Sequence, residues 1–369
     1  MSAGPRVTAV GRALPEHFYD QETLVAAFER EWGETLFNPE RLTRLHRNVQ
    51  VSGRHLALPI EAYPSLDSFT AANDAFIREG TELGARAIED GLAVAGLRPA
   101  DVDHLFFVSV TGIATPSIDA RLVNRLGLRP DVKRTPIFGL GCVAGAAGVA
   151  RAADYLRAFP DHVAVLLSVE LCSLTLQRRD VSIPNLIASG LFGDGAAAVV
   201  LEGGERANGA APSAGDASAA RSRPAISATR SVFYPDTEDV MGWRIGADGF
   251  QVVLSADVPD VVGTHVREDV DAFLAEHGCT RADVAAWIAH PGGPKVLEAL
   301  EGALELEAGP AGALGRTWRS LAEIGNLSSA SVLMVLHEAL AEGRPAEGES
   351  ALMLAMGPGF CSELVLLRG

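Results

Sequence analysis

The chain has little that would place it in a membrane or outside the cell. No run of about 18 apolar residues occurs among its 369 residues, so we expect no membrane-spanning helix. The first residues, MSAGPRVTAVGRALPEHF, lack a charged start followed by an apolar core, so no signal peptide is expected. These absences predict a cytoplasmic protein.

Cysteine is scarce and is not arranged in metal-binding patterns. The four cysteines are Cys142, Cys172, Cys279 and Cys361. None forms a CxxC pair, and none lies near a histidine at ligand spacing. We therefore expect free thiols, as in a reducing compartment, and no metal site.

Basic residues are outnumbered. The chain has 31 Lys and Arg against 47 Asp and Glu, a formal net charge of −16 and a pI near 5.0. A surface this acidic repels phosphate backbones, so nucleic acid is not an expected partner. A local basic cluster can still hold one anionic ligand.

Short apolar runs alternate with helical patterns along the chain. The runs predict strands and the periodic segments between them predict helices, so the alternation favours an α/β fold. The predicted strands are 104–110, 162–171, 195–203, 284–290, 351–356 and 362–369, and the predicted helices are 74–97, 119–128 and 296–306. Residues 203–225 are small and polar without periodicity, which predicts a flexible surface loop.

The parts occur twice in the same order. In each half a strand is followed by a helix, a glycine-containing turn with a small apolar helix, and two further strands. The turns are GLGC in the first half and EIGN in the second. This order predicts two pseudo-symmetric halves, 1–225 and 226–369.

Cys142 opens a helix rich in alanine and glycine. Unpaired N–H groups and the positive end of the helix dipole stabilise a thiolate there, so we expect a lowered pKa. Taken alone, a buried cysteine is more often a small core residue.

His290 and Asn326 strengthen the catalytic interpretation. His290 ends an apolar strand, where α/β enzymes place reactive groups, and Asn326 precedes the helix equivalent to that of Cys142. Singly, each has a structural explanation, a satisfied core histidine or a helix cap. Together they offer an activated thiol and two N–H donors for an oxyanion. Such a set would load an acyl group and stabilise an enolate beside it.

The order and surroundings of these residues resemble the type III polyketide synthases of the chalcone synthase superfamily. The matching stretches, within about 100–369, are GLGCVAGAAG, ELCSLT, GLFGDGAAAVV, WIAHPGGPKVLEAL, EIGNLSSASVL and MGPGF. The resemblance implies a thiolase-like αβαβα fold and a homodimer. It also implies acyl-CoA and malonyl-CoA as substrates, with no cofactor and no acyl carrier protein.

The resemblance also implies roles for individual residues. Cys142 matches the nucleophile that holds the starter and the growing chain. His290 and Asn326 match the pair that binds the thioester carbonyl and promotes decarboxylation of malonyl-CoA. Phe192 matches a gatekeeper phenylalanine between the CoA tunnel and the cavity. Val252 stands where a second gatekeeper aromatic is usual, which implies a wider entrance.

Further positions match residues around the family's cavity. Thr111, Cys172, Thr175 and Ser328 match cavity-lining residues. Thr115 matches a residue that reaches across the dimer into the partner's cavity and is often methionine in plant members.

Three arginines match the family's CoA-phosphate site. Arg41, Arg44 and Arg47 are spaced to lie along one face of a helix. A solvated basic face is the alternative, but a cluster of cations is conspicuous in so acidic a chain.

The small residues Val252, Thr115 and Thr111 suggest a cavity roomier than a coumaroyl site. The GCVAGAAG segment and the position of Cys172 resemble the bacterial synthases of alkylresorcinols and alkylpyrones. We therefore expect a fatty acyl-CoA starter on Cys142, extension with malonyl-CoA, and closure to an alkylpyrone or alkylresorcinol.

Three alternatives stay open. The first is a tetrahydroxynaphthalene-type synthase that uses malonyl-CoA as both starter and extender. The second, an enzyme like ketoacyl synthase III with carrier-bound malonate, is disfavoured by HPGGP, GPGF and the acidic surface. The third, a catalytically silent partner subunit, is disfavoured because all three polar residues are present.

Overall fold

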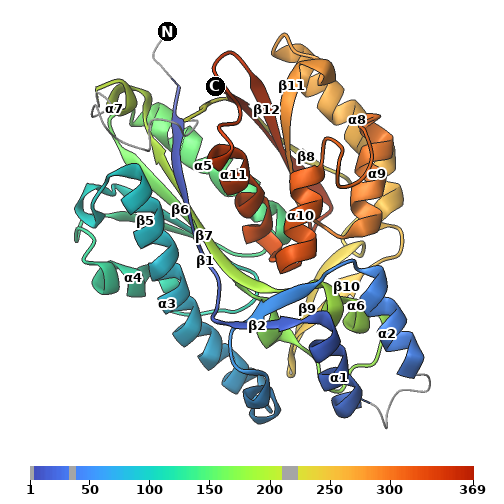
Figure 1. Cartoon of the computed structure of the whole chain (residues 1–369). Coiled ribbons are helices and arrows are strands. Elements are labelled where there is room, and N and C mark those ends of the chain that lie inside the picture. Colours follow the sequence, from blue (N-terminus) through green and yellow to red (C-terminus); the bar gives the residue numbers. More distant parts are fainter. Residues whose placement is uncertain (1–3, 33–38, 210–222) are drawn as a thin grey trace.

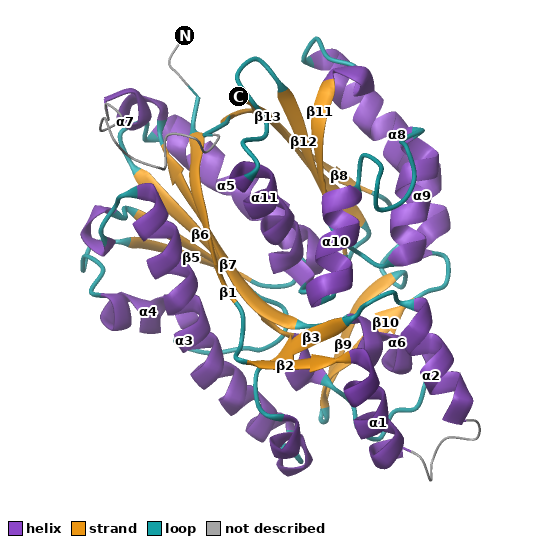
Figure 2. Ribbon diagram, in the orientation of Figure 1, coloured by secondary structure: helices purple, strands orange, loops and turns teal. Residues whose placement is uncertain are grey.

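The computed structural model describes residues 4–32, 39–209 and 223–369 of the chain. Its centre is a nine-stranded sheet (Figure 2), in which the strands follow the order β11-β12-β13-β8-β1-β7-β6-β4-β5. Their bounds are β1 (Arg6–Ala13), β4 (His104–Val108), β5 (Lys133–Ile137), β6 (Val163–Leu171), β7 (Asp194–Glu202), β8 (Ala225–Phe233), β11 (Val284–Ala289), β12 (Ser350–Gly357) and β13 (Cys361–Arg368). All six predicted apolar runs are strands, with ends shifted by a residue or two.

The sheet consists of two half-sheets joined at one point. Strands β1 and β8 pair only through Arg6 and Ala225. In the first half-sheet β4 pairs with β6 in parallel, whereas β6 with β7 and β7 with β1 are antiparallel pairs. In the second half-sheet the order β11-β12-β13-β8 has the same succession, one parallel pair followed by two antiparallel pairs. The repeat confirms two pseudo-symmetric halves. The boundary at residue 225 stays a prediction, although β8 begins there.

Helices form three layers around the two half-sheets. Helices α5 (Ala144–Ala158) and α11 (Ser331–Ala341) are buried in one apolar cluster with strands of both halves. Helix α3 (Phe69–Ala95) packs on the outer face of the first half-sheet, next to α4 (Ile118–Leu126). Helices α8 (Val258–Glu276) and α9 (Pro294–Leu304) cover the second (Figure 1). This arrangement confirms the αβαβα fold class.

Smaller elements gather at one end of the molecule (Figure 1). They are α1 (Gln21–Trp32), α2 (Pro39–Asn48), α6 (Ile183–Leu191) and the hairpins β2 (His17–Asp20) with β3 (Gly53–Leu56) and β9 (Met241–Gly246) with β10 (Gly249–Leu254). Of the predicted loop 203–225, residues 204–209 instead form a helix, α7 (Gly204–Gly209), and residues 210–222 lie outside the described part.

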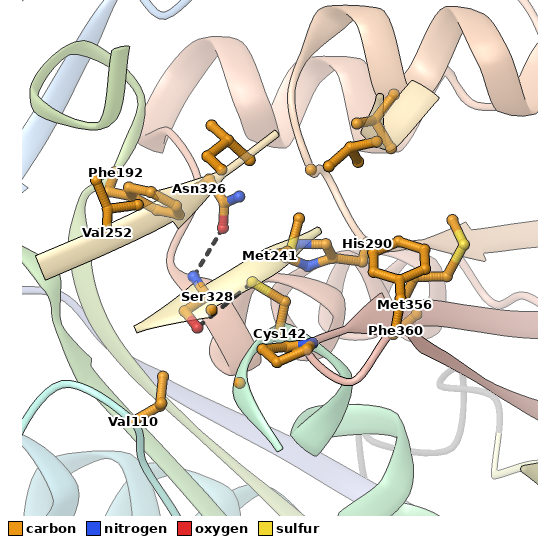
Figure 3. Close-up of a pocket in the computed structure, with 18 of the residues that line it drawn as sticks. Val110, Cys142, Phe192, Met241, Val252, His290, Asn326, Ser328, Met356 and Phe360 are labelled. Atoms are coloured by element: carbon orange, nitrogen blue, oxygen red, sulfur yellow. Dashed lines mark hydrogen bonds between the residues drawn. The ribbon is translucent and has the colours of Figure 1, made fainter. Parts of the chain in front are cut away.

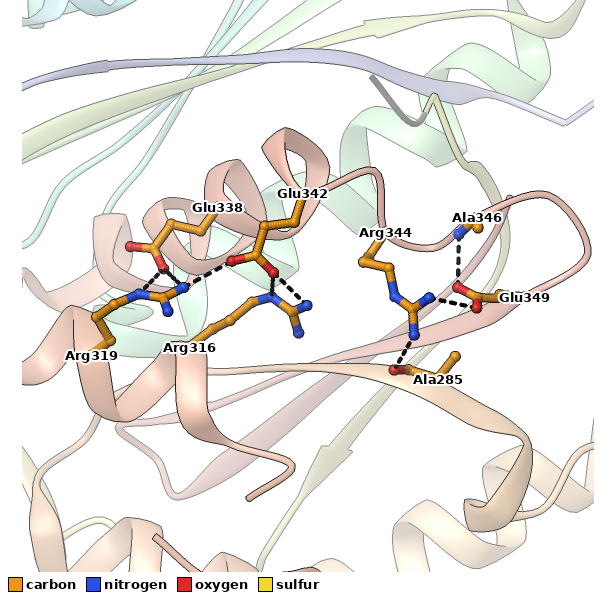
Figure 4. Close-up of polar contacts among 8 residues, drawn as sticks. All are labelled: Ala285, Arg316, Arg319, Glu338, Glu342, Arg344, Ala346 and Glu349. Carbon is orange, nitrogen blue, oxygen red and sulfur yellow. Dashed lines mark hydrogen bonds and ion pairs between the residues drawn. The ribbon is translucent and has the colours of Figure 1, made fainter. Parts of the chain in front are cut away.

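Ion pairs join α10 (Gly315–Ile324) to α11, the two helices that flank the turn of Asn326 (Figure 4). Arg319 lies 3.0 Å from Glu338 and 2.9 Å from Glu342, which also pairs with Arg316 at 2.6 Å. These pairs are half-exposed, so each contributes little alone, but the network fixes how the two helices meet. Within the described ranges, no helix is long and apolar enough to cross a bilayer.

Candidate active site

Cys142 lies in a tight turn between β5 and α5. Its neighbour Gly141 has φ +55°, in the left-handed region that favours glycine, and a Cβ there would lie 2.6 Å from the Pro358 ring. The GLGC turn therefore packs directly on the GPGF segment. This contact explains why both glycine-rich motifs occur in the chain.

The turn of Asn326 ties the two halves together at the site. The Asn326 amide donates to the Leu191 carbonyl at 2.9 Å, and the Gly193 amide donates to the Asn326 carbonyl at 3.0 Å. The side-chain Oδ1 accepts from the Ser328 amide at 2.8 Å, which fixes the orientation of the carboxamide. Asn326 and His290 lie beside the same cavity (Figure 3).

His290 follows β11 and is 6% exposed. Its amide donates to the Leu354 carbonyl at 2.9 Å, which holds it at the end of the sheet. The ring Nδ1 is buried and has no hydrogen-bond partner in the described part of the chain. Burial lowers the pKa of His290 to about 3, so the imidazole is neutral in the ligand-free protein.

The structure brings Cys142, His290 and Asn326 together around one cavity of about 60 Å³ (Figure 3). Ser328 also lines it, and its Oγ lies 3.6 Å from the Cys142 Sγ. The remaining wall is largely apolar, with Met241 among its members. A thiol, an imidazole and a carboxamide thus line one small space.

The expected thiolate is wrong for the ligand-free protein. Burial, and to a smaller extent the charge of Glu170, raises the pKa of Cys142 to about 12. No hydrogen bond joins Cys142 to His290 within the described residues, and the sulfur contacts Ser328 instead. The sequence shows a helix start but not the depth of burial, and here desolvation outweighs the dipole. The resting pair is a thiol and a neutral imidazole.

A buried carboxyl group that sequence reasoning missed lies behind this pair. Glu170 accepts hydrogen bonds from the Val110 amide at 3.1 Å, from the Thr111 hydroxyl at 2.9 Å and from the Ser329 hydroxyl. Burial raises its pKa to about 7. The signal in the sequence was a lone acid in the apolar run of β6.

Phe192 and Val252 lie where the site opens into a second cavity of about 460 Å³, and they line both spaces. Trp243, which the sequence analysis missed, lines both as well and pairs with Val252 across the β9–β10 hairpin. Paired residues project from the same face of a hairpin, so the indole occupies room that Val252 leaves. Asp-Gly between two short apolar runs was the available hairpin signal.

The other residues that were predicted to line the cavity lie in different places. Cys172 lines both cavities, and Thr175 lines the second. Thr111 lines a third cavity, of about 600 Å³, together with Thr175, and its hydroxyl is engaged by Glu170 and the Leu171 amide. Thr115 is exposed and lines none of these cavities. Of the three small residues, Val252 lines the cavity at Cys142, and the reach of Thr115 into a partner's cavity stays a prediction.

The three predicted CoA-binding arginines lie on α2, as expected. Arg41, Arg44 and Arg47 are all exposed, and no ion pair with them occurs among the described residues. Helix α2 packs against α6, the helix that ends immediately before Phe192. Their role toward CoA stays a prediction.

A Cys–His–Asn set where the two halves of an αβαβα fold meet defines a condensing enzyme of the thiolase type. Models of the chalcone and stilbene synthases match both halves, the N-terminal domain at residues 2–205 and the C-terminal domain at 225–369. The chain belongs to the chalcone and stilbene synthase family.

Its relatives include bacterial enzymes. The 1,3,6,8-tetrahydroxynaphthalene synthase of Streptomyces peucetius subsp. caesius is 53% identical over 365 residues, 99% of this chain and 93% of that protein. A putative chalcone synthase of Bacillus subtilis is 38% identical over 98% of this chain and 97% of that protein. The crystal structure of 1,3,6,8-tetrahydroxynaphthalene synthase from Streptomyces coelicolor A3(2) superposes with a TM-score of 0.88 at 30% identity, covering 98% and 99% of the two chains.

These matches confirm the resemblance. The protein is a type III polyketide synthase, an acyltransferase that catalyses decarboxylative condensation of CoA thioesters without a cofactor.

Proposed function

We propose that the protein is a tetrahydroxynaphthalene-type synthase that uses malonyl-CoA as both starter and extender. The observation that carries the proposal is the 53% identical relative, which has this activity in its name and matches 99% of the chain. The comparisons therefore favour this alternative over the fatty acyl starter.

The cavity supports a small starter. The space at Cys142 measures about 60 Å³, and Trp243 and Phe192 line it where it adjoins the second cavity. The adjoining space of about 460 Å³ is of the size that holds small organic molecules. A short malonyl unit fits the first space, and a lengthening chain can fold into the second.

The proposed roles follow from the geometry. The Cys142 sulfur attacks the thioester carbonyl of malonyl-CoA, the acyl group moves to that sulfur, and CoA leaves as a thiol with the displaced proton. A second malonyl-CoA then loses CO₂, and N–H donors of His290 and Asn326 stabilise the enolate. The enolate carbon attacks the Cys142 thioester, a carbon–carbon bond forms, and the sulfur leaves. The lengthened chain is then a CoA thioester, and it returns to the Cys142 sulfur as that CoA leaves. Repetition lengthens the chain before it cyclises.

Three further assignments remain part of the proposal. Arg41, Arg44 and Arg47 would hold the phosphates of CoA at the exposed face of α2, beside the helix that leads to Phe192. A homodimer, with Thr115 directed at the partner, and a cytoplasmic location complete it.

The direct test supplies malonyl-CoA alone. We expect 1,3,6,8-tetrahydroxynaphthalene, identified by mass spectrometry, and no label in that product when isotopically labelled acetyl-CoA is added. The reverse pattern would contradict the proposal: no product from malonyl-CoA alone, but alkylpyrones or alkylresorcinols once a fatty acyl-CoA is present.

Trp243→Gly tests the narrow entrance. Removal of the indole should raise kcat/KM for octanoyl-CoA relative to malonyl-CoA by about tenfold or more, the scale of discrimination by a few buried methylenes. Arg244→Gly is the matched control, because the next residue along β9 is exposed and faces away. An unchanged ratio in Trp243→Gly would remove the indole from starter selection.

A further inference from the structure

Arg54, on β3, is an arginine buried at the edge of the site. It is 2% exposed and lines the 460 Å³ cavity together with Phe192. Burial lowers its pKa to about 10, so the guanidinium still carries its charge at neutral pH. A buried charge is costly unless it is fully paired.

The contacts of Arg54 are not those of a purely stabilising residue. Its Nη1 donates to the carbonyls of Ser189 and Phe192, at 2.5 and 2.9 Å. Its Nε and Nη2 are buried and have no hydrogen-bond partner within the described part. It also forms no ion pair there, although Asp194 is near enough to stabilise its charge. Unsatisfied buried donors cost stability, so stability alone does not explain an arginine at position 54. The two bonds that Nη1 makes to backbone carbonyls are the better explanation.

Those two bonds fix the end of α6. The last carbonyls of a helix have no partner within it, and a cation there also opposes the helix dipole. In α6 the Ser189 carbonyl bonds to Arg54 and the Leu191 carbonyl bonds to the Asn326 amide. The backbone of Phe192 is thus held by Arg54 on one side and by the turn of Asn326 on the other.

The stem of Arg54 packs against the same junction. A Cβ on Gly325 would lie 3.2 Å from both Cγ and Cδ of Arg54, and Gly325 has φ +75°. One side chain therefore touches the residue before Asn326 and bonds to the residue at the entrance. A shift of Arg54 would move Phe192 relative to Asn326.

We propose that Arg54 is a positioning residue that fixes Phe192, at the entrance to the catalytic cavity, against the turn that carries Asn326. It acts through the backbone of Phe192 and does not touch the reacting atoms. The consequence for the reaction rests on the proposed function: a displaced Phe192 admits malonyl-CoA less productively and releases the chain too early.

The variants are Arg54→Met, which keeps much of the stem and removes the donors, and Arg54→Lys, which can restore one bond. Arg281→Met is the control, because Arg281 also donates to a helix-terminal carbonyl, that of Leu304 at the end of α9, outside the site. Kinetics with malonyl-CoA, product analysis and thermal unfolding are measured for all three.

For Arg54→Met we expect kcat/KM to fall by about 100-fold, carried mainly by kcat, with a larger share of short pyrones. Arg54→Lys should lie between Arg54→Met and the wild type. Arg281→Met should unfold at a lower temperature but keep the wild-type product ratio. A wild-type product ratio and kcat in folded Arg54→Lys or Arg54→Met would overturn the proposal.

A second measurement does not depend on turnover. Cys142 is alkylated with iodoacetamide and with the bulkier N-phenylmaleimide, and its modification is followed by peptide mass spectrometry. A loosened entrance should raise the maleimide-to-iodoacetamide rate ratio in Arg54→Met by about tenfold over the wild type. An equal ratio would overturn the positioning role. A raised ratio in a protein that makes no product from malonyl-CoA would overturn only the proposed function.

Discussion

Cys142→Ala is expected to abolish polyketide formation, with kcat/KM for malonyl-CoA reduced by about 10⁴-fold or more, as for loss of a covalent nucleophile. Cys142 is the thiol that shares the small cavity with His290 and Asn326, and alanine leaves no atom there to carry the acyl chain. The measurement is product formation together with the intact mass of the protein after incubation with malonyl-CoA. The wild type should gain an acyl adduct and the variant should not.

The control is the neighbouring thiol. Cys172 also lines the cavity and is 5% exposed, so a misleading adduct at the site can arise from it. Burial and the nearby carboxylates of Glu170 and Asp194 raise its pKa well above the ordinary range, which makes it a poor nucleophile. Cys172→Ala should retain the adduct on Cys142. An adduct that persists in Cys142→Ala and disappears in Cys172→Ala would transfer the nucleophile's role to Cys172.

Much of the fold could be predicted because it depends on local patterns. Strands buried on both faces are continuous apolar runs, so β6, β7 and β12 stood out along the chain. Repetition of the same order of elements revealed two halves. The turns of Cys142 and Asn326 were visible because each combines glycine with a polar residue before a small, buried helix.

What the sequence did not reveal depends on distances across the fold. Strand β1 escaped notice because its run RVTAVGRA begins with arginine and is broken near its end by Gly11 and Arg12. Trp243 was missed because its effect arises from pairing with Val252 across a hairpin. Thr111 lines a third cavity rather than the one at Cys142, with its hydroxyl bonded to Glu170. The protonation of Cys142 could not be predicted, because a sequence gives the helix start without the depth at which it lies.

The protonated state of the Cys142 thiol has a second large expected effect, on the rate at which this thiol is alkylated. Alkylation of Cys142 by iodoacetamide at pH 8 is expected to be about 10³-fold slower than that of an ordinary thiol, since only a thiolate reacts and a pKa near 12 leaves about one molecule in 10⁴ ionised. The pKa in the folded protein lies above the ordinary value, so the rate should rise about tenfold per pH unit from pH 8 toward pH 11. The measurement is the pH profile of modification in the ligand-free protein. A plateau already reached below pH 8 would instead show the thiolate that the sequence predicted.

Glu170 supplies the internal control for this profile. Its pKa of about 7 means that the carboxyl group is largely ionised at pH 8, where its charge raises the pKa of Cys142. Glu170→Gln should therefore speed alkylation at pH 8, with a smaller effect at pH 6, where the wild-type carboxyl group is mostly protonated.

Because His290 is neutral at rest, it is free to accept the proton that Cys142 must lose. In the proposed function, an anionic malonyl group in the cavity would raise the pKa of that imidazole and stabilise the proton on it.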